Sequence, residues 1–353
     1  MNLCEYKNKT VLVTGHTGFK GSWLCIWLLE LGANIIGVSK DPYTQNDNFV
    51  MSKLSDKITD LRCDITDLDK LKKIFDKYKP EVVFHLAAQP LVRLSYKEPV
   101  MTYNSNIMGT INLLECIRTS NSVGAGIIVT SDKCYENVNQ IWPYRENDRL
   151  GGYDPYSSSK ACAELAVSSY INSFFNPNES SHGKFIASVR AGNVIGGGDW
   201  SEDRIIPDII RSIQNKIPVE IRNPKSTRPW QHVLEPLRGY LLLGEKLILN
   251  KKEFIGAWNF GPDSNEFFSV ENIVEKIIKI WGNGSYNISK NTGPHEASLL
   301  SIDCTKAKKY LGWQPLLDID QALNMTVEWY KNYENTNVYD ICVNQIKNVE
   351  NLS

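Results

Sequence analysis

A glycine-rich segment near the start of the chain constrains the fold more than any other feature. Residues 11–13 form a short apolar, β-branched run, and residues 23–31 carry apolar side chains at helical spacing. Between the two runs lie Gly15, Gly18 and Gly21. A strand, a glycine turn and a helix in this order are typical of a dinucleotide site, where the backbone approaches a pyrophosphate at the helix N-terminus. Because the spacing is G-x-x-G-x-x-G rather than G-x-G-x-x-G, an ordinary surface turn stays the alternative.

Strand-like and helix-like segments alternate over the first half of the chain. Short apolar strands are predicted at 34–38, 61–63, 81–86, 125–131 and 185–190, with helices between them. This alternation predicts an α/β fold with a doubly wound parallel sheet of the NAD-binding Rossmann type and a smaller mixed α/β substrate lobe. We expect the NAD-binding domain at 1–193 plus a return segment at about 229–262, the smaller lobe at 194–228 and 263–335, and a tail at 336–353.

The composition excludes several classes of protein. The formal net charge is −1, so no overall field attracts nucleic acid or an anionic membrane. The eight cysteines are scattered without a C-x-x-C pair, and the five histidines show no paired spacing, so we expect reduced thiols and no metal site. The N-terminal sequence lacks an apolar signal core and no run reaches membrane-spanning length, which predicts a cytoplasmic protein without nucleic-acid or membrane partners.

Two acidic residues lie where the adenosine half of a dinucleotide is expected. Asp41 follows the second predicted strand, about twenty residues beyond the last loop glycine, where an acidic side chain often binds the ribose. This position favours NAD over the phosphorylated cofactor, but the neighbouring Ser39 and Lys40 do not decide between the two. Asp64 follows the third strand and is placed to bind the adenine amino group; a turn or helix-cap role is the alternative.

Further candidate residues follow the fourth and fifth predicted strands, at the sheet edge where parallel strands bind ligands. Residues 87–89, Ala-Ala-Gln, begin with two small side chains, which let a flat ligand lie close to the end of the strand. Ser131, Asp132 and Lys133 come directly after a buried apolar strand, where the reactive ring of the cofactor is expected. A solvated turn is the alternative interpretation.

A tyrosine and a lysine share one face of the next predicted helix. Asp154 and Pro155 are a typical N-cap and first residue, so Tyr156 and Lys160 lie one turn apart. Such a pair is common by chance, but here it follows a glycine-loop strand and Ser131. We expect the charge of Lys160 and of an oxidised nicotinamide to lower the phenol pKa from about 10 by about three units. Tyr156 would then act as the base in oxidation of a secondary alcohol that hydrogen-bonds Ser131.

Alcohol oxidation does not require a further carboxyl and amine, so Asp132 and Lys133 indicate an additional chemical step. A 4-keto group acidifies the hydrogen on carbon 5 of a sugar, so a base can remove it while an acid protonates the hydroxyl that leaves carbon 6. Return of the hydride to carbon 6 makes the net reaction a dehydration. A neutral amine and a protonated carboxyl would serve, and burial favours both; which group holds the proton is a coupled question that stays open.

The region after residue 190 carries the candidates for substrate binding. Residues 196–200, Gly-Gly-Gly-Asp-Trp, lack the strand–helix context of a phosphate loop and are interpreted as a flexible rim of the pocket. The basic and aromatic segment 222–232 contains Arg222 and Arg228 and could clamp a diphosphate and cover a base. Arg93, in a predicted loop, faces either a phosphate or solvent.

Motifs along nearly the whole chain resemble the extended short-chain dehydrogenase/reductase superfamily. They are TGHTGFKG at 14–21, HLAAQ at 85–89, the strand end at Ser131, YSSSK at 156–160 and RAGNVIGGGDW at 190–200. Within it, GHTGFKGSW at 15–23, TSDKCYE at 130–136 and RPWQHV at 228–233 resemble the branch of sugar-nucleotide dehydratases that act on CDP-D-glucose. Dehydratases of dTDP- or GDP-sugars usually carry Asp-Glu or Glu where this chain has Asp132 and Lys133. That departure fits the cytidine branch, with Asp132 as acid and Lys133 as carbon-5 base.

The resemblance implies an NAD-dependent hydro-lyase that converts CDP-D-glucose to CDP-4-keto-6-deoxy-D-glucose, for dideoxysugar and O-antigen synthesis. It implies a homodimer or homotetramer that pairs through the helices predicted at 99–118 and from 155 to 174. The implied catalytic residues are Ser131, Asp132, Lys133, Tyr156 and Lys160. The implied cofactor residues are Gly15, His16, Thr17, Gly18, Phe19, Lys20, Gly21, Asp41, Asp64, Ile65, Leu86, Ala87, Ala88, Gln89, Asn106, Tyr156 and Lys160. The expected substrate residues are Gln89, Arg93, Asn193, Arg204, Arg222, Arg228 and His295.

Two other functions fit the same motifs. A nucleotide-sugar epimerase also uses the Tyr–Lys pair but has no need of an acid–base pair over carbons 5 and 6. A non-catalytic NAD-binding sensor would keep the fold, but such proteins tend to lose the tyrosine or lysine, and Tyr156 and Lys160 are both present.

Overall fold

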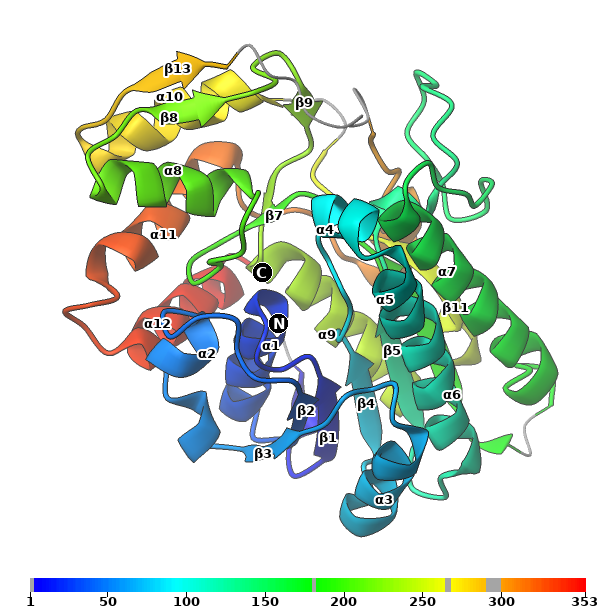
Figure 1. Cartoon of the computed structure of the whole chain (residues 1–353). Helices are drawn as coiled ribbons and strands as arrows, with labels where there is room; N and C mark the ends of the chain where they lie inside the picture. Colours follow the sequence, from blue (N-terminus) through cyan, green and yellow to red (C-terminus); the bar gives the residue numbers. More distant parts are fainter. Residues whose placement is uncertain (1–2, 180–181, 264–267, 290–299) are drawn as a thin grey trace.

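The computed structural model describes residues 3–179, 182–263, 268–289 and 300–353 of the chain. A parallel sheet of seven strands forms its centre, in the order β11-β6-β5-β4-β1-β2-β3 (Figure 1). The strands are β1 (Thr10–Thr14), β2 (Asn34–Ser39), β3 (Thr59–Arg62), β4 (Val82–His85), β5 (Ala125–Val129), β6 (Phe185–Arg190) and β11 (Gly256–Asn259). The predicted doubly wound parallel sheet is therefore confirmed.

The strand order reverses at β1, which lies between β2 and β4. Val13 of β1 pairs with Gly37 on one side and with Phe84 on the other. In a parallel sheet of this kind the crevice for a ligand opens at the carboxyl ends of the two strands that flank the reversal. The site is therefore expected where β1 and β4 end.

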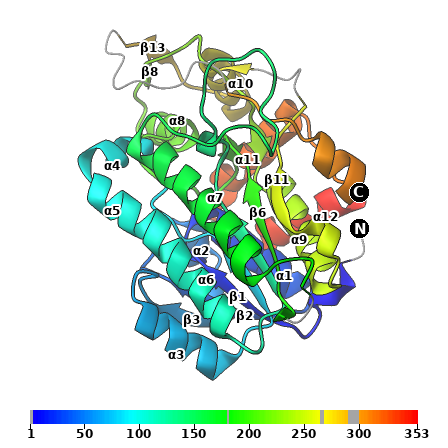
Figure 2. The ribbon, with the colours of Figure 1, turned by 90° about the vertical axis from the view of Figure 1, so that its right-hand side faces the viewer.

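Helices cover both faces of the sheet, as alternate residues of β1 show. Val11 and Val13 pack in a core with α1 (Phe19–Glu30), α9 (Leu234–Ile248) and α12 (Val338–Asn351). Leu12 points to the other face, into a core with α3 (Leu68–Tyr78), α6 (Gly109–Thr119) and α7 (Pro155–Phe174). Figure 2 shows α6 and α7 side by side on that second face. Among the described residues, no helix has the length and apolar character that a bilayer crossing would demand.

The helix predicted at 99–118 is continuous but not uniform. It consists of α5 (Pro99–Tyr103), a π-helical turn (Asn104–Met108) and α6. A π-turn inside an α-helix is frequent at functional sites. Here it contains Asn106, whose side chain is buried.

A smaller lobe, at the upper left of Figure 1, lies over the carboxyl ends of the strands. Three pairs of short strands build it together with α8 (Ile205–Gln214), α10 (Val270–Trp281) and α11 (Ile319–Asn332). The pairs are β8 (Val219–Ile221) with β13 (Tyr286–Ile288), β7 (Val194–Ile195) with β10 (Gln231–His232), and β9 (Thr227–Arg228) with β12 (Phe268–Ser269). The short helices α2 (Asn48–Met51) and α4 (Val92–Lys97) follow strands of the large sheet.

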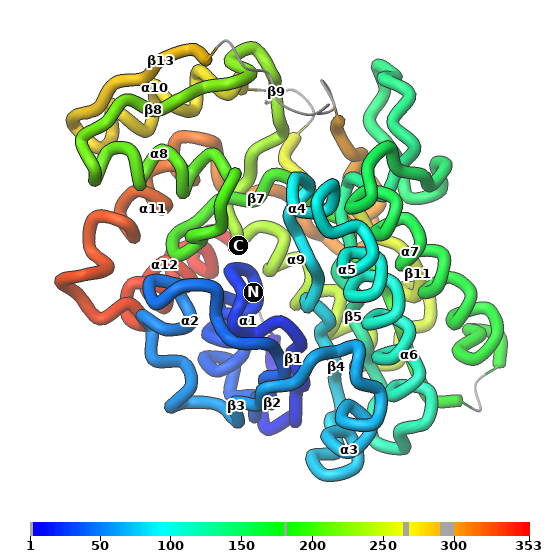
Figure 3. The backbone as a smooth tube through the Cα atoms, in the orientation of Figure 1, coloured from blue at the N-terminus to red at the C-terminus, as the bar shows by residue number. Residues whose placement is uncertain are grey.

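The end of the chain returns to the first lobe as a helix that the sequence analysis does not assign. Helix α12 lies against α1, which the backbone trace makes visible (Figure 3). The indole nitrogen of Trp27 donates to Glu350 over 2.9 Å, and the Tyr339 hydroxyl donates to Glu30 over 2.9 Å. The tail is thus part of the fold, because it covers an apolar face of the first helix.

Candidate active site

A cavity of about 430 Å³ opens at the carboxyl ends of β1 and β4, with the glycine loop as one wall. Gly15 has a φ of 75°, and a Cβ atom there would lie 2.6 Å from the nitrogen of Ala87. A Cβ atom on Gly21 would lie 2.1 Å from the Gly15 oxygen. Side chains are excluded at both positions, so the loop can pass close to β4 and α1 only with glycine there.

The cavity has the length and the donors that a dinucleotide requires. Helix α1 begins after Gly18, which supplies no side-chain cap, so its first N–H groups are left for an anion. The lining extends from Asp41 and Asp64 at one end to Tyr156 and Lys160 at the other. A pyrophosphate at the helix N-terminus would place the two nucleoside halves at these ends, so the residues present fit NAD.

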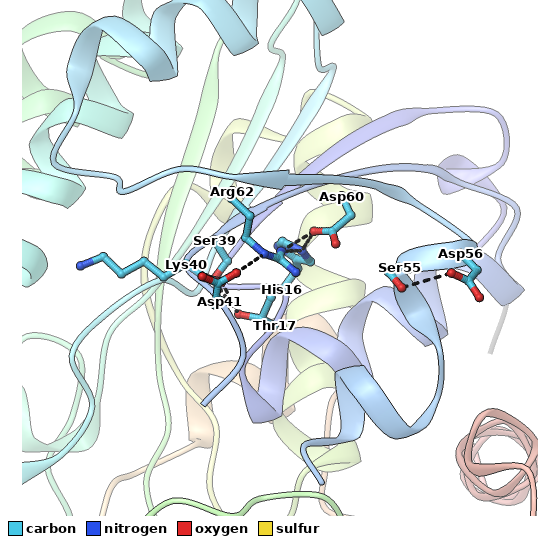
Figure 4. A network of polar contacts seen from close by, with 9 residues as sticks. All are labelled: His16, Thr17, Ser39, Lys40, Asp41, Ser55, Asp56, Asp60 and Arg62. Carbon is cyan, nitrogen blue, oxygen red and sulfur yellow. Dashed lines mark hydrogen bonds and ion pairs between the residues drawn. The ribbon is translucent and has the colours of Figure 1, made fainter. Parts of the chain in front are cut away.

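Charged residues meet at the adenosine end (Figure 4). The Arg62 Nε atom donates to Asp41 over 2.9 Å, and Arg62 also contacts Asp60. The Asp41 side chain is 88% exposed, so it is available to a ribose hydroxyl. Lys40 forms an ion pair with Asp64 at 2.6 Å.

His16 does not line the cavity, although it belongs to the glycine-loop motif. Its imidazole is buried, with Nε2 2.7 Å from Asp60 Oδ1 and the ring edge against Phe49. The ring occupies the space beside Gly37, where a Cβ atom would approach it to 2.5 Å. Burial lowers the His16 pKa, so the ring is a neutral packing element. The prediction of His16 as a cofactor residue is therefore not supported for its side chain.

Asn106 is also placed differently from the prediction. Its amide nitrogen donates to the Gln89 oxygen over 3.1 Å and to Ser159 over 2.8 Å, and its oxygen accepts from the Gln89 nitrogen over 2.8 Å. Both amide atoms make hydrogen bonds within the protein, and the side chain lines neither this cavity nor the second one described below. Asn106 therefore holds the loop after β4 instead of a ligand. Gln89 itself lines the cofactor cavity and donates to Thr102 over 2.8 Å. Gln89 is also a predicted substrate residue, but it does not line the second cavity, which is described below.

The remaining predicted cofactor residues all line this cavity. They are Gly15, Thr17, Gly18, Phe19, Lys20, Gly21, Asp41, Asp64, Ile65, Leu86, Ala87, Ala88, Gln89, Tyr156 and Lys160.

A second cavity, of about 350 Å³, lies under the smaller lobe and meets the first. Both cavities are lined by Lys20, Ser131, Tyr156 and Arg204. The end of β5 therefore lies at the junction, where a cofactor ring and a second ligand would touch.

The segment after β5 places three predicted catalytic residues in the second cavity. Ser131 Oγ donates to Asp132 Oδ1 over 2.9 Å and accepts from the Lys133 backbone nitrogen over 3.2 Å. Asp132 is only 3% exposed and packs on Gly192, where a Cβ atom would lie 1.9 Å from Asp132 Oδ2. Lys133 lines the cavity, and its ammonium contacts no acceptor among the residues that the structure describes. The carboxyl and the amine thus face one space.

The ionisation of the Tyr–Lys pair depends on burial. Asp154 caps α7 as expected, which places Tyr156 in the first turn. Burial raises the pKa of Tyr156 to about 12, against the lowering effect of a hydrogen bond with Ser131 and of the charge of Arg204. Lys160 lies deeper, with Nζ 3.4 Å from the Val129 oxygen. Without the cofactor, desolvation is the larger effect on the phenol pKa. The predicted lowering counts the charge of an oxidised nicotinamide as well as that of Lys160, so it stays a prediction.

The far end of the second cavity is built from paired charges. Arg93 of α4 and Arg222, which follows β8, contact the same carboxylate of Asp203 at 3.2 and 3.1 Å. Arg204 pairs with Asp199 at 2.8 Å. The predicted substrate residues Arg93, Asn193, Arg204, Arg222 and Arg228 line the cavity, and His295 lies outside the described residues.

The sequence analysis missed the two carboxylates that hold these arginines. Asp203 carries no local motif, and its partners come from distant segments. Asp199 lies in the segment 196–200, which was predicted to be a flexible rim. Instead this segment is anchored, because Trp23 donates to the Gly197 oxygen over 2.9 Å and a Cβ atom at Gly197 would lie 2.0 Å from Trp329.

Comparison with known proteins agrees with this geometry. A family model described as GDP-mannose 4,6 dehydratase matches residues 12–326. A CDP-glucose 4,6-dehydratase of Salmonella typhimurium is 50% identical over 328 residues, which cover 92% of this chain and 91% of that protein. A UDP-glucuronate 4-epimerase of Thermodesulfobacterium geofontis is 28% identical over 91% of this chain and 95% of its own length.

A solved structure shows the same architecture. The crystal structure of UDP-glucuronic acid 4-epimerase from Bacillus cereus, in complex with UDP-glucuronic acid and NAD, superposes with a TM-score of 0.76 at 25% identity. The match covers 92% of this chain and 99% of that one. Since the family model spans most of the chain and a relative shares half of its residues, the chain belongs to the GDP-mannose 4,6 dehydratase family, in the branch of the CDP-glucose 4,6-dehydratases.

Proposed function

We propose that the protein is an NAD-dependent hydro-lyase that converts CDP-D-glucose to CDP-4-keto-6-deoxy-D-glucose. One observation carries this proposal: Asp132 and Lys133 face a cavity that meets the glycine-loop cavity at Tyr156. An acid, an amine and a phenol at the junction of the two cavities supply what oxidation followed by elimination requires. The relative from Salmonella typhimurium, a CDP-glucose 4,6-dehydratase that is 50% identical, supports the same reaction and a cytidine nucleotide as part of the substrate.

The cofactor side of the site binds and orients. NAD⁺ supplies a hydride acceptor for carbon 4 and a hydride donor for carbon 6, so the reaction has no net redox change. The N-terminus of α1 would hold the pyrophosphate, and Asp41 would bind the adenosine ribose. The small side chains of Ala87 and Ala88 leave room at the end of β4.

Tyr156 removes the proton of the carbon-4 hydroxyl, and Ser131 hydrogen-bonds that oxygen. With a pKa of about 12 the phenol holds its proton at neutral pH, so it needs added positive charge to act as a base. The charge of Arg204 already acts to lower the pKa of the phenol, and an oxidised nicotinamide would add a further positive charge.

Asp132 and Lys133 carry out the elimination. Lys133 takes the carbon-5 proton, and Asp132 gives a proton to the hydroxyl that leaves carbon 6 as water. A proton then returns to carbon 5 when carbon 6 receives the hydride.

The charged end of the cavity binds the diphosphate. Arg93 and Arg222 both pair with Asp203, and Arg228 lines the same cavity. Guanidinium groups suit phosphate oxygens because they donate two parallel hydrogen bonds.

Incubation with CDP-glucose in deuterated water tests the proposal. We expect a 4-keto product that has lost water and carries deuterium at carbon 5, measured by mass spectrometry and NMR. A panel of CDP-, dTDP-, UDP- and GDP-glucose should show the highest kcat/KM for CDP-glucose. A change of configuration at carbon 4 without loss of water would establish an epimerase, and bound NAD without turnover of any of these sugars would establish a sensor.

We propose further that the protein forms a homodimer through α5, α6 and α7. These helices and the π-turn between α5 and α6 leave Val100, Met108, Leu165 and Phe174 exposed, by 80%, 46%, 58% and 46%. Burial of these side chains against a second copy would remove apolar surface from water. Light scattering should give twice the mass of the chain, or four times for a tetramer, and Leu165→Glu should give the mass of one chain.

A further inference from the structure

A buried ion pair lies beneath the site and takes no part in the proposed chemistry. Glu164 is one helical turn beyond Lys160 on α7, and its carboxylate pairs with Arg190 of β6 at 2.8 Å. Both side chains are 3% exposed. Buried charges are costly unless fully paired, so their presence here calls for a reason.

The carboxylate of Glu164 accepts hydrogen bonds from β6 and from the residue that follows β5. One oxygen accepts from Arg190 over 2.8 Å and from the Ser188 hydroxyl over 2.8 Å. The other oxygen accepts from the hydroxyl of Thr130. Thr130 directly precedes Ser131, so the carboxylate is tied to the strand end that carries the reactive groups.

Arg190 is fixed in turn. Its guanidinium donates to the Tyr135 hydroxyl over 2.7 Å and to the Glu146 backbone oxygen over 3.0 Å. Its charge and the hydrogen bonds to the carboxylate outweigh the effect of burial and lower the pKa of Glu164. Glu164 therefore carries its negative charge throughout the neutral range.

Four groups act on Lys160 from the elements around it. Burial raises the pKa of the Cys134 thiol, which is therefore uncharged. Burial lowers the pKa of His85, on β4, to about 3, so it is uncharged as well. Lys20, in α1, adds positive charge when protonated. Glu164 is thus the source of stable negative charge among these four groups. It lies one helical turn from Lys160, whereas Arg190, whose charge opposes it, lies on β6.

We propose that Glu164 is a positioning residue for the reaction, which keeps the Lys160 ammonium protonated from one helical turn below. The carboxylate offsets the desolvation of Lys160, which by itself favours the neutral amine. Burial lowers the Lys160 pKa to about 8 even with Glu164 in place, so the margin at neutral pH is small. The effect on turnover rests on the proposed function, whereas the effect on the proton of Lys160 does not.

The test replaces the charge and keeps the shape. In Glu164→Gln the amide oxygen can accept from Arg190 and Ser188, and the amide nitrogen can donate to Thr130. The Thr130 hydroxyl can then donate to the Val189 oxygen, 3.3 Å away. The pKa of Lys160 is measured by competitive acetylation followed by peptide mass spectrometry, which needs neither substrate nor cofactor.

We expect the Lys160 pKa to fall by roughly one unit in Glu164→Gln. The alkaline limb of the kcat–pH profile with CDP-glucose should move to lower pH by the same amount. An unchanged Lys160 pKa in a folded Glu164→Gln protein would overturn the proposal. If wild-type protein turns over no nucleotide sugar, the proposed function fails, but the acetylation result still decides the role of Glu164.

Two controls separate charge from structure. Ser188→Ala removes a neutral hydrogen bond to the same carboxylate, and Val167→Ala creates a cavity at a buried position on the next turn of α7. Both should lower the melting temperature and leave the Lys160 pKa unchanged. A shift in Ser188→Ala as large as in Glu164→Gln would overturn the proposal.

Glu164→Asp is the second variant if Glu164→Gln does not fold, because it keeps the negative charge. We expect the Lys160 pKa of Glu164→Asp to match that of wild type, and a value one unit lower would overturn the proposal.

Discussion

The two cavities of this protein differ in what forms their walls. The cofactor cavity depends on missing side chains, since a Cβ atom on Gly15 or Gly21 would collide with backbone. The substrate cavity depends on side chains that are present and charged, since Arg93 and Arg222 share one carboxylate. The first cavity therefore lets a ligand lie close to the backbone, and the second presents charged groups to its ligand.

This contrast shows why the two cavities tolerate change differently. In the first cavity the hydrogen-bond donors are backbone N–H groups, whose positions follow from the fold. Ligand binding there fails when an added side chain displaces the loop. Paired arginines provide donors that depend on a few side chains, so single substitutions weaken binding without disturbing the rest. Five predictions test the contrast, in decreasing order of expected effect.

Tyr156→Phe, at the junction of the cavities, should have the largest effect. Loss of the base should slow hydride transfer by roughly 10²–10⁴-fold, the usual contribution of a general base. The measurement is the absorbance of reduced nicotinamide after rapid mixing with CDP-glucose. Tyr170→Phe, on the same helix, is the control; reduction at the wild-type rate in Tyr156→Phe would assign the base to another group.

Lys133→Ala should separate oxidation from elimination. We expect NAD and substrate binding to persist while formation of the 4-keto-6-deoxy product falls by at least about 10²-fold, because no amine remains to take the carbon-5 proton. The readout is deuterium at carbon 5 together with product mass. Turnover close to that of wild type would remove Lys133 from the mechanism.

Arg222→Ala should weaken substrate binding alone. Loss of one charged hydrogen-bond donor to a diphosphate should raise the KM for CDP-glucose roughly tenfold, while the Kd for NAD stays constant. Arg149→Ala, whose side chain is 82% exposed, is the matched control. An equal loss of NAD affinity in Arg222→Ala would show that the two cavities are not independent.

Gly21→Ala should act through shape. The added Cβ atom would lie 2.1 Å from the Gly15 oxygen, so the loop must shift at a cost of about 1–3 kcal/mol in the free energy of unfolding. Urea titration and the Kd for NAD measure the two effects. Gly124→Ala is the control, because a Cβ atom there would lie 4.0 Å from the Gly183 oxygen. Equal behaviour of the two variants would contradict the close-approach argument.

Lys20→Met should have the smallest effect, and its sign depends on pH. Burial and the charge of Arg204 lower the Lys20 pKa to about 7, whereas an unfolded lysine titrates near 10.4. Between these values the unfolded chain binds the extra proton, so Lys20 makes the free energy of unfolding rise with pH.

The methionine variant lacks this titration. It should melt a few degrees above wild type near neutral pH and lose that advantage as the pH approaches about 10. Melting temperatures across this range check it, with the exposed Lys251→Met as control. A difference that does not vary with pH would show that Lys20 holds its proton in the folded state.

Local patterns were enough to predict the cofactor cavity. The strand, glycine loop and helix at the start of the chain, and the cap at Asp154, depend on residues within a few positions of each other. The exceptions are instructive. His16 belongs to the same motif, but its ring faces inward because β2 places Gly37 beside it. Asn106 lies in a π-turn, and its amide contacts the loop after β4 instead of lining a cavity.

The substrate cavity was only partly predictable. Its arginines are conspicuous in the sequence, but Asp203, which holds two of them, has no local signal. The raised pKa of Tyr156 was missed because it depends on burial beneath a second lobe, which helical spacing does not reveal.

The sequence by itself determined the sheet, the glycine loop, and the set of groups available for proton transfer. Only the tertiary structure decided which carboxylate meets which arginine, which side of the loop His16 occupies, and how strongly desolvation acts on Tyr156, Lys20 and Lys160. The reason is physical. Backbone conformation is governed by neighbours in the chain, whereas charge pairing and burial are governed by neighbours in space.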